Sequence, residues 1–104
     1  MKILVLMDLT PGTRPEDLGP YLREEAARAW ELYAAGIFRD MNFRTDRLGV
    51  VNTLECAGVE EAREILNTLP LAKAGFLQFE IIPLSYPAFL ENLWVAPAEV
   101  SHAD

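Results

Sequence analysis

Residues that build metal and disulfide sites are nearly missing from this sequence. Its 104 residues include one cysteine, Cys56, and one histidine, His102, so the chain can form no internal disulfide and no Cys/His metal cluster. The GxSxG, GxGxxG and HExxH motifs of nucleophile, dinucleotide and zinc sites are also absent. Any reaction must then depend on acid-base groups, and no cofactor is expected.

Positive charge and long apolar runs are scarce as well. Nine Lys and Arg residues stand against 16 Asp and Glu residues, a net charge of -7, and the basic residues are scattered. Nucleic-acid binding needs a basic face, so it is not expected. No segment approaches the roughly 18 consecutive apolar residues of a membrane span, and the N-terminal MKILVLMDL fits a strand better than a signal peptide. We expect a soluble, cytoplasmic protein.

Apolar residues, by contrast, make up 51% of the chain. A single domain of this size buries only part of its unfolded surface, so the excess suggests that another subunit covers some of it. We predict one domain over residues 1–95, followed by a polar C-terminal tail over residues 96–104.

Hydrophobic periodicity predicts six elements of secondary structure. Strands are expected at residues 2–9, 37–44, 48–56 and 76–84, and amphipathic helices at residues 18–35 and 59–69. Pro20 is tolerated only in the first turn of the first helix, Gly36 follows that helix, and Pro70 ends the second. The order predicts an α+β, ferredoxin-like βαββαβ protomer, whose four antiparallel strands carry two helices on one face.

The strand expected at residues 76–84 is apolar on both sides. Leu77, Phe79 and Ile81 point one way, and the opposite side also begins and ends with an apolar residue. Because the helices cover only one face of the sheet, something else must cover the other. We expect a second copy, packed sheet against sheet in at least a homodimer. The alternative is that the segment PAFLENLW folds back over its own sheet.

Two stretches resemble a known family. The run LNTLPLAKAGFLQFEIIPLSYP (residues 66–87), with a Leu-Pro-Leu turn before a strand that ends in Pro-Leu, resembles the C-terminal half of muconolactone isomerase and its relatives. The run EEAARAWELYAAGIFRDMNFR (residues 24–44) resembles uncharacterised members of that group. The resemblance implies the dimeric α+β barrel superfamily, in which two sheets pair into a barrel with a ligand pocket beside the sheet.

The resemblance also implies a range of functions. Muconolactone isomerase moves a double bond in a small anionic lactone, and other members oxidise aromatic polyketides without a cofactor or bind small molecules. We therefore expect a small-molecule-binding, isomerase-like protein that transfers protons on a small anionic or aromatic metabolite. The alternatives are a non-catalytic ligand-binding or structural oligomer and a cofactor-independent oxygenase of aromatic substrates. A histidine-dependent mechanism is excluded from the core, since His102 lies in the tail.

Glu25 is the candidate catalytic residue. On a helical wheel it falls between Leu18 and Leu32, inside the apolar arc that should face the sheet. A carboxylate there is either paired or raised in pKa, and both conditions suit a general acid or base. The structural alternative is a salt bridge to a strand arginine, or a glutamate at the edge of the arc whose oxygens reach water.

Arg39 and Arg44 are the candidate substrate-binding arginines. Helix and strand rises place Glu25 level with the middle of the second expected strand, within reach of both side chains. Their opposite index parity means that only one points toward the helix. That arginine could hold a substrate carboxylate or enolate while Glu25 moves the proton, or it could simply form a buried ion pair.

Tyr33 is a further candidate for substrate binding. Together with Trp30 and Tyr21 it could form the wall of an aromatic pocket, although such residues more often pack in the core or at subunit contacts. Cys56 follows the third expected strand with no base nearby in sequence, and is most simply a small buried hydrophobe.

Overall fold

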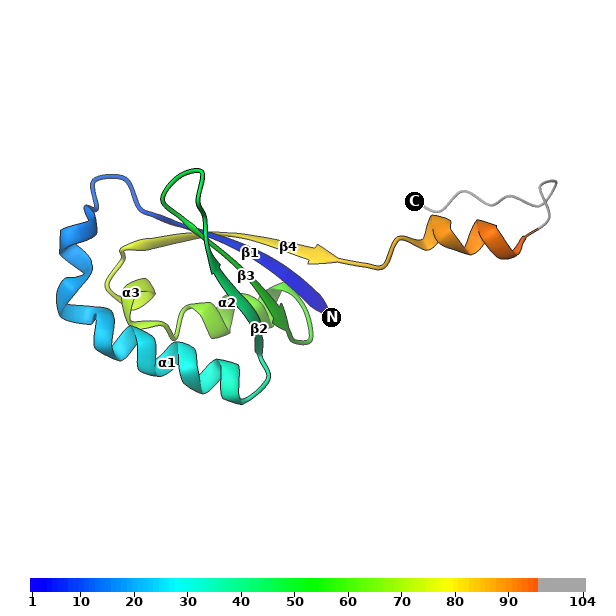
Figure 1. The fold of residues 1–104 in the computed structure, drawn as a ribbon. Coiled ribbons are helices and arrows are strands. Elements are labelled where there is room, and N and C mark those ends of the chain that lie inside the picture. Colours follow the sequence, from blue (N-terminus) through cyan, green and yellow to red (C-terminus); the bar gives the residue numbers. More distant parts are fainter. Residues whose placement is uncertain (96–104) are drawn as a thin grey trace.

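A four-stranded antiparallel sheet carries helices on one face in the computed structural model (Figure 1). The strands are β1 (Lys2–Leu9), β2 (Phe38–Phe43), β3 (Val50–Glu55) and β4 (Leu77–Leu84). The helices are α1 (Leu22–Ala34), α2 (Val59–Leu66) and the one-turn α3 (Pro70–Lys73), with 3-10 helices η1 (Pro15–Tyr21) and η2 (Ala88–Trp94). The strand order β2-β3-β1-β4 confirms the predicted ferredoxin-like fold.

The structure describes residues 1–95, so the tail predicted at residues 96–104, and His102 within it, lie outside the described part. Within residues 1–95, no helix is both long and apolar enough to cross a membrane.

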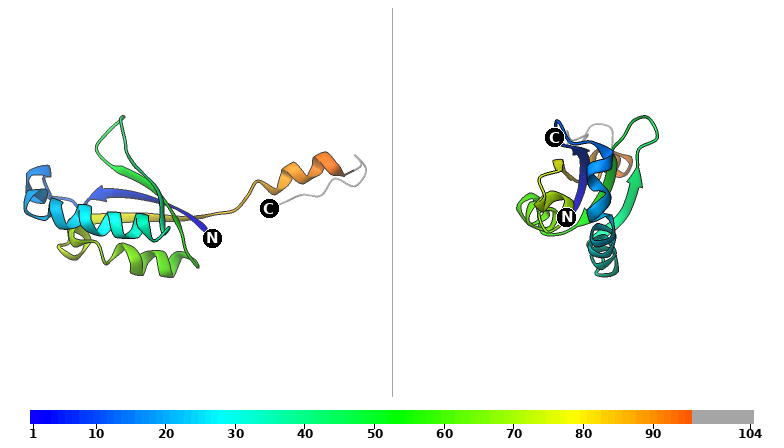
Figure 2. Two further views of the ribbon diagram at one scale, coloured as in Figure 1. Left: turned by 60° about the horizontal axis from the view of Figure 1, so that its bottom comes forward. Right: turned by 90° about the vertical axis from the view of Figure 1, so that its left-hand side faces the viewer.

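The two sides of β1 have different neighbours. Ile3 and Val5 are fully buried beneath the helices and Met7 is nearly so, whereas Leu4 and Leu6 point to the opposite face and are half-buried. Figure 2 shows that α1 and α2 lie on the same side of the sheet. The core on that side is completed by Leu32, Phe38, Leu54, Ala62, Leu66 and Leu69. None of the helices formed by residues 1–95 lies over the face that carries Leu4 and Leu6.

The first helix begins later than the periodicity predicts. Residues 15–21 form η1, and α1 starts only at Leu22, after Pro20. Proline supplies no backbone N–H, so it cannot join the hydrogen bonds of an α-helix interior. The backbone N–H of Arg14 donates to the carboxylate of Asp17 at 2.9 Å, which fixes the first turn of η1.

The end of α1 confirms the predicted role of Gly36. This glycine has a φ of 78°, its N–H donates to the carbonyl of Tyr33, and the N–H of Ile37 donates to the carbonyl of Leu32 at 2.9 Å. These are the two bonds of a Schellman motif. In the last turn of α1, Leu32 is buried, whereas its neighbour Tyr33 is 46% exposed.

The second helix is shorter than predicted. It ends at Leu66, and Pro70 opens the separate turn α3 instead of ending a longer helix. Proline is well tolerated at the first position of a helix, where no N–H is needed. The backbone N–H of Leu71, in the first turn of α3, is consequently free to bond a side chain.

The two edge strands are irregular. The pairing of β2 with β3 shifts register between Phe38 and Asp40, which leaves Arg39 as the extra residue of a β-bulge. The other edge strand, β4, pairs with β1 and carries Pro83 opposite Ile3.

Beyond β4 the chain runs away from the sheet as a C-terminal arm, residues 85–95, that contains η2 (Figures 1 and 2). The molecule measures 61 × 29 × 22 Å with a radius of gyration of 17.6 Å, where a compact chain of this length has about 13 Å. The large apolar side chains of the arm are exposed: Tyr86, Phe89, Leu90, Leu93 and Trp94. The segment PAFLENLW therefore does not fold back over its own sheet.

Candidate functional site

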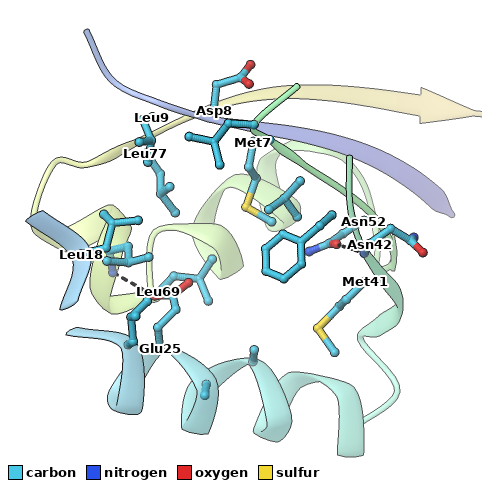
Figure 3. A pocket seen from close by; sticks show the side chains of 18 of the residues that line it. Met7, Asp8, Leu9, Leu18, Glu25, Met41, Asn42, Asn52, Leu69 and Leu77 are labelled. Carbon is cyan, nitrogen blue, oxygen red and sulfur yellow. Dashed lines mark hydrogen bonds between the residues drawn. The ribbon is translucent and has the colours of Figure 1, made fainter. Parts of the chain in front are cut away.

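A pocket of about 390 Å³ lies between α1 and the sheet (Figure 3). It is at the end of the sheet opposite the C-terminal arm, because it is lined by the last residues of β1, including Leu9, and by Leu77 at the start of β4. Its walls are mostly apolar, and its polar lining residues are Asp8, Glu25, Asn42 and Asn52. An apolar cavity of this size with a few polar groups is typical of small-molecule sites.

The spacing of residues on α1 creates this space. Leu22, Glu25, Ala26 and Ala29 all line the pocket and follow the i, i+3, i+4, i+7 pattern of one helix face. The two alanines are too small to fill the gap between helix and sheet, so the cavity remains. Glu25 thus occupies the sheet-facing position that the helical wheel indicated.

Glu25 is a half-buried carboxylate with a main-chain partner. Its Oε1 accepts a hydrogen bond from the backbone N–H of Leu71, in the first turn of α3, at 2.9 Å. Burial raises the pKa of the Glu25 carboxyl, and the Leu71 hydrogen bond opposes part of that increase. The ion pairs found within residues 1–95 do not involve Glu25. An acid in this state is suited to exchange protons.

Asn52 is the polar residue across the pocket that sequence reasoning did not select. It lies on β3 with 2% of its surface exposed, and its Oδ1 accepts the backbone N–H of Asn42 at 3.1 Å. Since the oxygen faces β2, the amide nitrogen faces the other way, toward the pocket (Figure 3). Asn52 can therefore donate a hydrogen bond to a ligand oxygen. Its place in the alternation of VVNTL, on the same face as the buried Leu54, was the available signal.

The two candidate arginines lie outside the pocket lining. Arg39 is exposed at the bulge of β2. Arg44 donates from Nε and NH2 to Asp46 at 2.9 and 2.6 Å, which lowers the pKa of Asp46 to about 2. The stem of Arg44 does lie against the pocket wall, because a Cβ placed on Gly49, a lining residue, would be 3.0 Å from its Cδ. Glu25 therefore lines the pocket without either arginine, and Arg44 stands beside its wall.

Tyr33 and Trp30 lie on the outer surface of α1. Their ring centroids are 5.5 Å apart, both side chains are exposed, and neither lines the pocket. The aromatic wall expected from these residues is therefore not part of this pocket.

Asp8 is at the pocket edge but directs its carboxylate outward (Figure 3). Arg47 donates from NH1 to Asp8 Oδ1 at 2.8 Å, and this hydrogen bond lowers the pKa of the Asp8 carboxyl. A paired, ionised carboxylate is a weaker candidate for proton transfer than Glu25. Among residues 1–95, no group of three or more His, Cys, Asp or Glu side chains is placed to hold a metal ion.

Comparisons with known proteins support the fold. No protein-family model matches the sequence, and no curated protein matches it. The structure is similar to that of 5-chloro-2-hydroxyhydroquinone dehydrochlorinase from Burkholderia phenoliruptrix, solved in complex with 2,5-dihydroxybenzoquinone. The TM-score is 0.68 at 15% identity, over 85% of this chain and 97% of that one. The similarity shows a shared fold, and membership of the muconolactone isomerase-like group stays a prediction.

Proposed function

We propose that the pocket binds a small oxygen-bearing aromatic metabolite and that Glu25 transfers a proton on it, as an isomerase or a related proton-transfer enzyme. The carrying observation is that a half-buried carboxylate of raised pKa and a buried amide donor, Asn52, both line one apolar pocket. The dehydrochlorinase of the same fold, crystallised with a dihydroxyquinone, supports a ligand of this type.

The two polar groups suggest a division of work. Ionised Glu25 takes a proton from a hydroxyl, or from a carbon next to a carbonyl, and the negative charge moves onto the carbonyl oxygen. The amide nitrogen of Asn52 donates to that oxygen and stabilises the charge in an apolar environment. Protonated Glu25 then returns the proton at another carbon, which completes a double-bond shift. Burial raises the pKa of Glu25, which makes its ionised form a stronger base than an exposed glutamate.

The apolar lining favours a ligand with an aromatic or quinonoid ring over a small aliphatic anion. Within the described residues, the pocket lining contains no Lys or Arg. Arg44 is the better of the two candidate arginines for contacting a substrate, because its stem lies beside Gly49 of the wall. Its guanidinium group would first have to break its hydrogen bonds to Asp46. We therefore expect Arg44 to contact a ligand only at the edge of the pocket.

The bare face of the sheet supports pairing with a second copy. Leu4 and Leu6 on β1, Val51 on β3 and Ile82 on β4 are neighbours on this face, as their register shows. An apolar sheet surface without a covering layer is a typical subunit contact. We therefore place a homodimer in the proposal, formed sheet against sheet, and expect a molar mass in solution of at least two chains.

The test replaces Glu25 with Gln and uses Glu24→Gln as its matched control. Glu24 is the exposed neighbour on α1, so the control makes the same charge change outside the pocket. Binding of 2,5-dihydroxybenzoquinone is measured by calorimetry, and exchange of its ring hydrogens for solvent deuterium is followed by NMR. Glu25→Gln is expected to slow the enzyme-promoted exchange by about 100-fold or more, while Glu24→Gln leaves it unchanged. Equal exchange rates in both variants would overturn the catalytic role.

A non-catalytic binding protein is the second candidate function. A closed pocket lined only by aliphatic and phenyl groups would favour it, but Glu25 and Asn52 line this one. The same titration separates the two functions, because a binding protein would take up the quinone without promoting any exchange. An oxygenase of aromatic substrates would be favoured if Trp30 and Tyr33 faced an open cavity, but both lie outside this pocket.

A further inference from the structure

The large apolar side chains exposed on this molecule fall mainly into two groups. Within residues 1–95, thirteen such residues are exposed, and five of them lie on the C-terminal arm. Four more form a rim around the pocket: Leu22, Met41, Phe43 and Leu48, which are 42–84% exposed although they line the cavity. An isolated soluble protein rarely exposes so much clustered apolar surface, so both groups are candidates for an interface.

The arm itself is chemically suited to an apolar site. Its one charged residue, Glu91, accepts a hydrogen bond from the hydroxyl of Tyr86, which occupies the carboxylate within the arm. The other large side chains of the arm are Phe89, Leu90, Leu93 and Trp94, and Trp94 is 86% exposed. Aromatic side chains of this kind commonly anchor protein interfaces.

The arm cannot easily reach the rim of its own chain. It starts after Leu84, at the end of the sheet away from the pocket, and β4 with its eight residues spans about 26 Å. The arm reaches about 24 Å, from three extended residues and the seven residues of η2. It would have to reverse direction after Leu84, and even then only its tip would arrive. It instead points away from the body (Figure 1).

A second copy removes this mismatch. If two sheets pack face to face with their strands antiparallel, the arm of one copy leaves beside the pocket end of the other. Each chain carries one arm and one rim, so a twofold pair occupies both rims at once, as in an exchange of identical elements. An unrelated partner would leave the arm, the rim or both uncovered.

The areas are consistent with this arrangement. The three aromatic side chains of one arm, at their observed exposure, offer roughly 300–500 Å² of surface, so two arms offer roughly 600–1,000 Å². A specific, stable interface needs about 1,200–2,000 Å² in total. The surface of the arms is therefore about half of such a total, and the rims that they cover and the bare sheet face supply the rest.

We infer that the C-terminal arm of a second copy docks on the rim formed by Leu22, Met41, Phe43 and Leu48 and closes the mouth of the pocket. The inference rests on the sheet-face pairing in the proposed function. The site is incomplete in one chain, because the mouth between α1 and the β2–β3 hairpin stays open to water. The aromatic side chains of the partner arm would exclude that water and contact the outer edge of an aromatic ligand.

The experiment cross-links two differently marked chains. Both carry Cys56→Ser, which removes the native thiol; one also carries Asn92→Cys on the arm and the other Thr45→Cys in the hairpin beside the rim. After the chains are mixed and exchanged, a short bismaleimide is expected to join the arm of one to the rim of the other. A control chain with Glu64→Cys, exposed on α2 away from the pocket, is expected to give little product. Equal yields from the rim and control chains would overturn the inference.

A second measurement does not depend on where the cross-linking cysteines are placed. Phe89→Ala with Trp94→Ala removes two exposed anchors, so the folded chain itself should be unaffected. The expected result is at least a tenfold loss of affinity for 2,5-dihydroxybenzoquinone, because the mouth opens. Unchanged affinity overturns the inference even if the proton exchange by Glu25 is confirmed. Conversely, a specific cross-link without any effect of Glu25→Gln supports the arm and refutes the catalytic proposal. A single-chain molar mass refutes both the arm and the dimer.

Discussion

The two faces of the sheet both carry hydrophobic side chains but are covered differently. On one face Ile3, Val5 and Leu54 are fully buried under helices of the same chain. On the other, Leu4 and Leu6 of the same strand β1 are only half-buried. The first face supplies the stability of the isolated chain, and the second has hydrophobic surface that a single copy does not use. The apolar residues of a strand therefore do not by themselves show where the core lies. They stabilise the isolated chain only where helices of the same chain pack against them.

The largest effect is expected from Leu54→Ala on the covered face. The substitution leaves a cavity beneath the helices and should lower the free energy of unfolding by about 2–5 kcal/mol. Leu6→Ala is the matched control, since it removes the same atoms from the bare face without enclosing a cavity in the chain. Urea unfolding in dilute protein measures both changes. Equal losses would abolish the distinction between the two faces.

A smaller decrease in the free energy of unfolding is expected from Asn52→Leu, which replaces a buried polar residue on the covered face. The backbone N–H of Asn42 loses its acceptor, at a cost of about 1–3 kcal/mol in thermal or urea unfolding. Asn52→Asp keeps an acceptor at this position but buries a carboxylate, so its stability should recover as the pH falls and the carboxylate is protonated. If Asn52→Asp were insensitive to pH, the site would be more open to water than the structure indicates.

The bare face is tested by Leu6→Lys. A charged side chain in a sheet-to-sheet contact should weaken self-association at least tenfold, or about 1.4 kcal/mol, while the dilute monomer keeps its unfolding curve. Sedimentation velocity over a concentration series measures the association. Lys2, already exposed on this face, provides the control variant Lys2→Ala, which should leave association intact. A Leu6→Lys protein that associates normally would place the contact elsewhere.

The smallest effect is a change in the pH dependence of stability at Glu25. Burial raises its folded pKa above the unfolded value, so the folded chain holds the proton more tightly. The resulting stability is complete below the unfolded pKa and is lost as pH rises through the folded pKa. Glu25→Gln lacks this titration. As pH rises, the free energy of unfolding of Glu25→Gln should therefore increase relative to that of wild type. Glu24→Gln should show the same pH dependence as wild type. If Glu25→Gln also showed it, the raised pKa of Glu25 would be contradicted.

Much of the fold follows from local sequence patterns. The predicted bounds of β1 match the structure, and Gly36 was found because a left-handed residue after a helix favours glycine. The start of α1 was missed because Leu18 and Leu22 keep the helical spacing through η1. Periodicity does not detect the missing N–H of Pro20, which separates the two helices.

The site was predictable on the helix and less so on the sheet. Glu25 could be placed because α1 is regular from end to end. The arginine argument used strand parity, but the bulge at Arg39 adds a residue to β2 and reverses the parity beyond it. Asn52 was hard to select for the same reason, since its partner, the Asn42 N–H, depends on that register. The direction of the arm after Pro87 has no periodic signal at all.

The two irregular edges of the sheet also restrict how this molecule can assemble. At one edge the bulge at Arg39 bends β2, and at the other Pro83 removes a backbone donor from β4. Natural sheets use such features against unwanted edge-to-edge growth, which leads to open-ended fibres. Both edges are thus protected against templating another strand. Such edges leave the side-chain surfaces as the better place for the proposed contact between copies, where a pair can close and growth stops.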